Sequence, residues 1–406
     1  MLLLGVSVVI FIIQILTLRP PVGIGEPYWI AKHLAAGEGF IYPYPFDSAW
    51  LPTCYIPPLY VWFHAAIIGI GGGLVVTQIA GLIFFHAANF FFYKFFQRIT
   101  TKTIAFIGFC GLACYVPLWL ISQKPDPDGL NLLLIALTIL TLDRIISKQK
   151  ISSMWNWVTL GILFGLQILV RPDILMGIVL FGLWLLFYSG KYWLRNGIRF
   201  CFSVAIALAM VLPWTIRNYN TFHSFVLVSS NSGFNFFIGN NPIATGEFQQ
   251  GVSNAESQRM DTARTEFYRV HTSPVERDSY LFKVGKDWVL EHPGDALILG
   301  MKKCYYHWWQ REYAGGSIAA SAWMVTGYKF ISIFLLTFGF IGLFSLRSKS
   351  SRALLMTLFL YSTLISVIFF TQSRHRAIKI DPYLVTLSII GVGATLKKIK
   401  RNESKQ

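Results

Sequence analysis

Side chains that can move a proton or bind an anion gather near the ends of the apolar runs of this chain. The middles of those runs are nearly free of charge, whereas a proton-coupled transporter usually needs ionisable groups there. The set comprises Glu26, Asp126, Asp128, Arg171, Asp173, Arg217, Arg374, Arg376 and Lys379. A carboxylate can accept a proton from an attacking hydroxyl, and cations can stabilise an anionic leaving group. The set therefore predicts one site with two chemical roles.

The acids also have structural interpretations. Glu26 can cap the short helix predicted within "GEPYWIAKHLAAGEGF", residues 25–40. Asp128 stands just before an apolar run and fits an N-cap, whereas Asp126, between two prolines, has less structural reason to be acidic. Arg171 and Asp173 in "VRPDIL" can equally form an ion pair at a hinge between two runs.

The basic stretch "SRHRAIK" carries Arg374, Arg376 and Lys379 just before the last apolar run. On the topology below it faces away from the cytoplasm, although basic loops are normally cytoplasmic. A bound phosphate is the more economical explanation of this departure. The stretch is therefore a candidate anion site.

Composition and charge distribution indicate a polytopic membrane protein. The 406 residues are 54% hydrophobic and 13% charged, and the net charge is +16. The basic residues recur in short clusters between apolar runs, a pattern typical of cytoplasmic loops and not of a nucleic-acid-binding surface. Runs of spanning length lie near residues 2–18, 74–96, 103–121, 129–146, 155–171, 173–189, 198–216, 322–346, 352–371 and 381–396. A further run, 58–73, either crosses the membrane or is re-entrant or interfacial, and the second interpretation is preferred. The expected number of spans is therefore ten, or eleven if this run crosses.

Three parts follow from this topology. Residues 1–216 form an N-terminal membrane module with a first outer loop at 19–57, residues 217–321 an extracytoplasmic region, and residues 322–406 a C-terminal membrane module with a basic cytoplasmic tail. Capping-box spacings at Ser253 and Ser273 predict two helices in the outer region, and "DALILGMKKCYYHWW" predicts a third. The spacing of Cys and His shows no metal site, and a disulfide between Cys54 and Cys304 remains open.

Several segments, in order, resemble those of a known family. They are "GEPYWIAKHLAAGEGF", "PPLYVWFHAAIIGIGG", "PDPDGLNLLL", "LVRPDIL", "LPWTIRNYNTFHSFVLVSSNSGFNFFIGNNP", "EHPGDALILGMKKCYYHWW" and "RHRAIKIDPYL". The sequence resembles the lipid-linked-sugar glycosyltransferases of the GT-C fold, in the branch similar to protein O-mannosyltransferases and aminoarabinose transferases. One departure is "CYIPPLY", where the aminoarabinose branch has an acidic–basic pair before "PPLY". That substrate and a metal contact at that point are therefore not implied.

The resemblance implies an all-α GT-C-like bundle with juxtamembrane helices and a mainly helical outer loop. It implies a catalytic acid at Glu26, a second acid at Asp126 or Asp128, and lipid-phosphate contacts from Arg374 and Arg376. Lys379, in the same basic stretch, is a third candidate ligand of the donor phosphate. Further candidates for substrate binding are Arg171, Arg217, Asn240, Asn241 and Tyr60. Asn240 and Asn241 fit a plain turn equally well.

The expected activity is inverting transfer of one sugar from a polyprenyl-phosphate carrier to a hydroxyl of a glycan, lipid or protein. It would occur on the extracytoplasmic side of a bacterial inner membrane, without nucleic acid and with no certain cofactor, a divalent cation being possible. Two alternatives stay open: a flippase or transporter for a lipid-linked glycan, and a polysaccharide polymerase or ligase.

Overall fold

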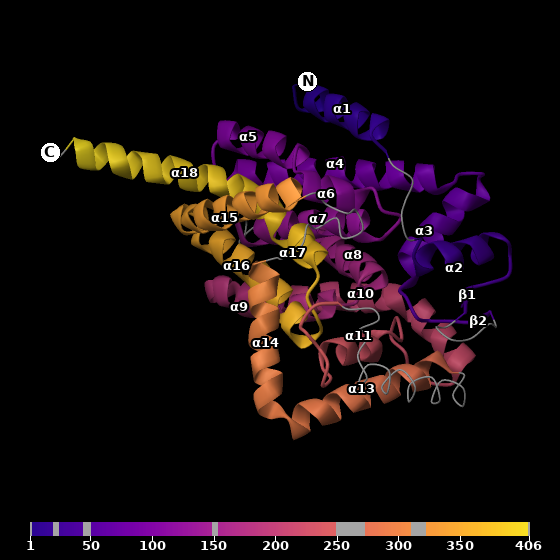
Figure 1. Ribbon diagram of the computed structural model, residues 1–406. Coiled ribbons are helices and arrows are strands. Elements are labelled where there is room, and N and C mark those ends of the chain that lie inside the picture. Colours follow the sequence, from indigo (N-terminus) through magenta and orange to yellow (C-terminus); the bar gives the residue numbers. More distant parts are fainter. Residues whose placement is uncertain are drawn as a thin grey trace.

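The chain is almost entirely α-helical in the computed structural model (Figure 1). The structure describes residues 2–18, 24–43, 50–147, 153–248, 273–309 and 322–404. Within these ranges the one sheet is a short antiparallel pair, β1 (Ile41–Tyr42) with β2 (Leu51–Pro52). The expectation of an all-α membrane protein is confirmed.

The apolar helices correspond to the predicted runs. They are α1 (Leu2–Leu16), α3 (Pro58–Gly69), α4 (Leu74–Ile99), α5 (Lys102–Ala113), α6 (Val116–Ser122), α7 (Asp128–Ser147), α8 (Met154–Val170), α9 (Ile174–Tyr188), α10 (Trp193–Phe222), α15 (Ala322–Ser345), α16 (Lys349–Ile368) and α18 (Asp381–Glu403). A 3₁₀ turn, η1 (Gly190–Tyr192), joins α9 to α10. α10 continues past the predicted module boundary at residue 216.

Fewer of these helices can cross a bilayer alone than the predicted ten or eleven. Among the described residues, five are long and apolar enough, or seven if each of two bent pairs counts as one span. The bent pairs are α5 with α6, at 56°, and α17 (Ser373–Lys379) with α18, at 60°. α1, α3, α8 and α9 are apolar but shorter. The 12 residues of α3 rise only about 18 Å against a hydrocarbon core of about 30 Å, which favours an interfacial position for 58–73.

Close helix packing builds the membrane bundle. α15 lies along α18, α4 along α7, and α8 along α10. Glycines permit the closest of these approaches: a Cβ on Gly342 of α15 would lie 1.8 Å from the carbonyl oxygen of Leu387 in α18. Small residues at helix contacts are characteristic of membrane bundles, in which packing replaces the hydrophobic effect.

The remaining helices lie outside these packed pairs. They are α2 (Glu26–Ala35), α11 (Ser232–Gly239), α13 (Pro274–Glu291) and α14 (Pro293–Trp308). In Figure 1, α13 and α14 form a bent arm, and the C-terminal end of α18 projects on the side opposite α2 and the β-pair. Gly37, just after the end of α2, has φ +80°, a conformation that glycine adopts without strain.

The outer region bears out some of the local expectations. α13 begins at Pro274 directly after Ser273, although the Ser273 side chain makes no capping hydrogen bond. α14 covers most of the third predicted helix. The capping box at Ser253 lies outside the described residues. The disulfide that the sequence left open is not formed, because Cys54 and Cys304 are both free thiols.

Candidate functional site

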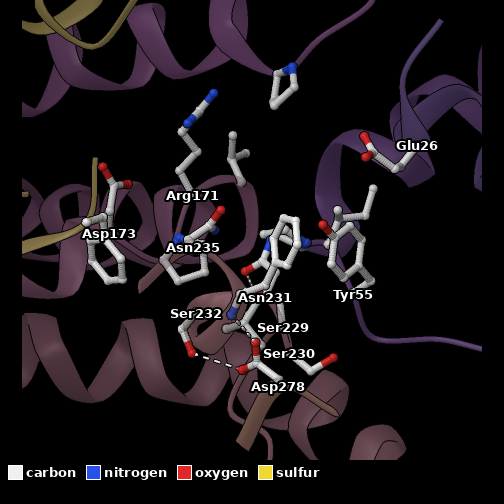
Figure 2. Close-up of a pocket in the computed structure, with 18 of the residues that line it drawn as sticks. Glu26, Tyr55, Arg171, Asp173, Ser229, Ser230, Asn231, Ser232, Asn235 and Asp278 are labelled. Carbon is white, nitrogen blue, oxygen red and sulfur yellow. Dashed lines mark hydrogen bonds between the residues drawn. The ribbon is translucent and has the colours of Figure 1, made fainter. Parts of the chain in front are cut away.

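The segments predicted as separate outer loops meet around one cavity of about 920 Å³ (Figure 2). Its walls come from the start of α2, residues 55–61, 126–127, 170–176, 225–235, 275–279 and 365–375. Glu26, Asp126, Arg171 and Arg374 all line it. Groups from opposite ends of the polypeptide therefore share one hollow.

Glu26 presents a carboxylate to this cavity from the first residue of α2. It makes no hydrogen bond or ion pair with any other described residue. The Glu26 side chain therefore does not cap α2 by a hydrogen bond. Its charge and, more strongly, burial raise the pKa of Tyr42 to about 12. A Cβ on Gly25 would lie 3.7 Å from Oδ1 of Asp126, so the start of α2 runs close to the second acid.

The loop before α7 carries Asp126 and Asp128. It is held against α4 by close backbone approach, because a Cβ on Gly81 would lie 2.0 Å from the carbonyl oxygen of Ser122. Asp128 is buried and accepts a hydrogen bond from Arg171, at the end of α8. Asp126 keeps 26% of its side chain exposed and faces the cavity.

Arg374 in α17 completes this charged side of the cavity. Its Nη1 lies 3.5 Å from Oδ2 of Asp128 and 3.8 Å from Oδ2 of Asp126. Its Nε donates to Oε1 of Gln372 at 2.6 Å, which fixes the guanidinium. A guanidinium has five N–H donors, and 34% of this side chain is exposed, so it can bind a further anion.

The pKa of Asp126 is raised, mainly by burial and then by the charge of Asp128. The positive charges of Arg374, Arg171 and Lys124 oppose this effect without cancelling it. Asp126 is therefore a better proton acceptor than an ordinary carboxylate.

Two predicted phosphate ligands lie away from the cavity lining. Arg376 is 0% exposed; its Nε donates to Oδ1 of Asp381 at 2.7 Å and its Nη1 to the carbonyl oxygen of Trp308 at 2.6 Å. Lys379 is buried, donates to Asp173 and lies 4.5 Å from the ring centre of Tyr361. Arg376 thus connects α17 to α18 and α14, and Lys379 connects α17 to the turn between α8 and α9.

Three of the other predicted substrate contacts are structural in this arrangement. Arg217 donates from Nη1 to the carbonyl oxygen of Thr53 at 2.8 Å and fixes the first outer loop on α10. Asn240 donates to the carbonyl oxygens of Phe236 and Ile368 at 2.8 and 2.9 Å.

Asn241 makes a local turn. It donates to the carbonyl oxygen of Phe237 at 2.8 Å and accepts from the amide of Ile243 at 2.9 Å. The plain turn, given above as the alternative to a substrate contact, is therefore present at Asn241. Tyr60, in contrast, does line the cavity.

Residues 229–232, 234 and 235 and Asp278 also line the cavity, and charge-based reasoning from the sequence missed them. The segment "SSNSGFN" is uncharged, and its serines and asparagines are common in ordinary turns. Its only signal was its place within the resemblance.

The described residues contain no group of three or more His, Cys, Asp or Glu side chains suited to a metal ion. Asp128, the buried acid of the 126–128 pair, points at Arg171 instead of at a third carboxylate.

Part of the chain matches a known protein family, and the whole fold resembles solved structures. Residues 56–216 match the family model described as dolichyl-phosphate-mannose-protein mannosyltransferase, so this segment is related to glycosyltransferases. No curated protein matches the chain in sequence.

Two solved structures of the oligosaccharyltransferase from Archaeoglobus fulgidus share the arrangement of helices. The one tethered to an acceptor peptide is 14% identical, with a TM-score of 0.57 over 100% of this chain and 51% of that chain. The one with an inhibitory peptide and a dolichol-phosphate is 14% identical, with a TM-score of 0.54 over 99% and 51%. The fold is that of GT-C glycosyltransferases.

This chain spans about half the length of those two GT-C structures. ArnT from Cupriavidus metallidurans, bound to undecaprenyl phosphate, is also similar: 15% identical, with a TM-score of 0.42 over 97% of this chain and 77% of that chain. The arrangement of helices shared with the two oligosaccharyltransferase structures confirms the predicted GT-C fold.

Proposed function

We propose that this protein transfers a sugar from a polyprenyl-phosphate carrier to an acceptor hydroxyl, and that Glu26 and Arg374 carry the two halves of the chemistry. The observation that carries the proposal is the shared cavity, in which a carboxylate with no described partner and a partly exposed guanidinium face one space. The match of residues 56–216 to a mannosyltransferase family supports the reaction class.

The reaction is a single displacement. The acceptor oxygen forms a bond to the anomeric carbon as the bond from that carbon to the phosphate oxygen breaks, and the phosphate leaves with the electron pair. Glu26 takes the proton of the attacking hydroxyl. Attack opposite the leaving group inverts the anomeric centre. Asp126, whose pKa is raised, lies close enough to the start of α2 to orient the acceptor or assist Glu26.

Arg374 and Arg171 stabilise the negative charge on the departing phosphate. Oriented cations are most effective where water is excluded, because the local dielectric is low. The cavity also has apolar lining residues, namely Leu175, Met176, Ile365, Phe369 and Phe370. They suit the first units of a prenyl chain. The dolichol-phosphate in one structure of similar fold agrees with such a donor.

Substitution of Glu26 by Gln tests the proton acceptor. Glu26→Gln preserves the size of the side chain and breaks no described hydrogen bond, so folding and membrane insertion should be normal. Loss of a general base typically costs about 10²- to 10⁴-fold in rate, measured as transfer of radiolabelled sugar from the lipid. Glu38→Gln, on the same outer loop but outside the cavity lining, is the matched control. Wild-type turnover by Glu26→Gln would remove Glu26 from the mechanism.

Arg374→Ala tests the phosphate contact. A charge-assisted hydrogen bond contributes about 1.5–3 kcal/mol, so affinity for polyprenyl phosphate should fall about 10- to 150-fold. Arg347→Ala, exposed between α15 and α16, removes the same charge outside the cavity and should have no effect. Mass analysis of the lipid that copurifies with the protein decides between one sugar on a phosphate and an oligosaccharide on a diphosphate.

A further inference from the structure

One face of the cavity is polar without being charged. It consists of Ser229, Asn231, Ser232 and Asn235, which we call the polar wall. In Figure 2 it lies below Arg171 and Asp173, with Glu26 on the other side. The mechanism above uses the acids and the cations but assigns nothing to these four side chains.

The backbone that carries the polar wall is held by side chains of α10. Trp214 donates from Nε1 to the carbonyl oxygen of Val228 at 2.7 Å. Asn218 donates from Nδ2 to the carbonyl oxygens of Val226 and Val228 at 3.2 and 3.1 Å. These bonds satisfy buried carbonyl groups and fix residues 226–228 before any ligand binds.

A second clamp fixes the start of α11. Asp278 of α13 accepts hydrogen bonds from the amide of Phe234 at 2.9 Å and from Oγ of Ser232 at 3.2 Å. α13 approaches so closely that a Cβ on Gly233 would lie 1.9 Å from the carbonyl oxygen of Asp278. Asp278 is thus a positioning residue for the wall.

Hydrogen-bonding capacity remains in the wall after these contacts. The Asn235 side chain makes no hydrogen bond with any described residue and faces the cavity near Arg171 (Figure 2). Oγ of Ser229 donates to Oδ1 of Asn231 at 3.2 Å, which leaves the two N–H donors of that amide available. Amides and hydroxyls can each donate and accept, as sugar hydroxyl groups also can.

The rings of Tyr55 and Phe234 adjoin this face, with centres 6.2 Å apart, and both line the cavity. Few fixed polar groups beside aromatic surface are typical of small-molecule sites, where the polar groups set orientation and specificity. A sugar ring presents hydroxyl groups at its edge and C–H groups on its faces, which matches both kinds of surface.

We propose that the polar wall is a subsite that binds the hydroxyl groups of a sugar ring, with Asn235 as its main specificity-determining residue. The proposal deepens the function above and rests on it for the presence of a sugar in the cavity. The wall binds a neutral polyol, while Arg374 and Arg171 bind the phosphate, so ring and phosphate are recognised independently. The ring belongs either to the lipid-linked donor or to the acceptor.

The test measures equilibrium binding to the purified full-length protein in detergent. The donor probes are polyprenyl phosphate and polyprenyl-phosphate glucose, mannose, galactose and arabinose. The acceptor probes are methyl glycosides of these sugars, added with the phosphate site saturated by polyprenyl phosphate. We expect at least one donor sugar to bind about tenfold more tightly than the bare lipid, or at least one methyl glycoside to bind.

Asn235→Leu should weaken that sugar binding about tenfold, the value of one or two hydrogen bonds, and leave the affinity for bare polyprenyl phosphate unchanged. Loss in the donor panel assigns the wall to the donor sugar, and loss in the glycoside panel assigns it to the acceptor. Asn220→Leu, exposed on α10 outside the cavity lining, is the matched control. Asn235→Ser, which keeps a polar side chain, serves if the leucine variant does not fold.

Equal sugar binding by wild type and Asn235→Leu would overturn the subsite, as would the absence of any sugar preference in both panels. Transfer is assayed separately. Sugar preference without transfer would refute the proposed reaction but not the subsite, and transfer without an effect of Asn235→Leu would refute the subsite alone.

Discussion

Asp126 holds a partly buried negative charge next to a second carboxylate, and this arrangement should lower the stability of the folded protein. Because its pKa is raised in the folded protein, the folded state binds the proton more tightly than the unfolded state does. The ionised carboxylate therefore reduces stability as pH rises above the ordinary range of an aspartate. The cost is complete once the pH exceeds the raised pKa of Asp126 in the folded protein.

We expect Asp126→Asn to raise the unfolding temperature at pH values above the raised pKa of Asp126, where the wild-type carboxyl is ionised in both states, while reducing transfer. The gain should disappear as pH falls below about 3, where the wild-type carboxyl is protonated in both the folded and the unfolded state. Thermal unfolding of the two proteins in detergent at several pH values measures this difference. A lower unfolding temperature for the variant at these pH values would contradict this. It would show that attraction between the Asp126 carboxylate and the neighbouring arginines outweighs the cost of burying the charge.

At the residue scale, charge at the ends of apolar runs was enough to find Glu26, Asp126 and Arg374 in the cavity. It could not separate Arg374 from Arg376, because both are basic and stand in the same short helix. Residues two apart in a helix do not share a face, so Arg374 lines the cavity while Arg376 pairs with Asp381. Which face is turned inward depends on tertiary packing that no local pattern contains.

At the scale of elements, hydropathy located nearly every apolar helix but not the breaks within them. The run 103–121 is divided between α5 and α6, which are bent by 56°. Pro117 at the start of α6 was the available signal, since the residue before a proline disfavours the helical conformation. Hydropathy averages over a window and does not register backbone direction.

The contact of α15 with α18 gives a prediction about packing. Gly342→Ala places a methyl group within 1.8 Å of the Leu387 carbonyl oxygen, a backbone atom, so the two helices must separate. We expect a loss of about 1–3 kcal/mol, as for overpacked cores, seen as a lower unfolding temperature. Gly393→Ala on α18, which meets nothing within 4 Å, is the control. Equal stability of the two variants would contradict the close approach.

At the scale of the whole molecule, the cavity and the basic tail lie at different ends of the bundle. Figure 1 shows α2 and the end of α18 on opposite sides. With α3 interfacial, the positive-inside rule predicts a cytoplasmic tail and a cavity on the opposite side of the membrane. We propose this sidedness in addition to the reaction.

A labelling experiment tests it. In a cysteine-free background, Glu38→Cys should react with a membrane-impermeant maleimide in intact cells, and Lys398→Cys only after permeabilisation. Both positions are exposed, so accessibility is not limited by the fold. Labelling of both from outside would mean that α3 crosses the membrane and would reverse the side of every later loop.

Because the cavity is lined from Glu26 to His375, almost the whole chain must be made before the site exists. Membrane helices insert as synthesis proceeds, so Glu26 leaves the ribosome long before Arg374, which lines the same cavity. A nascent chain lacking α17 carries the acids without Arg374 and so cannot act on a donor. Two fragments divided before α15 should each be inactive when expressed alone. When coexpressed, they should recover sugar transfer only if they associate, so assembly of the helices is the last requirement for catalysis.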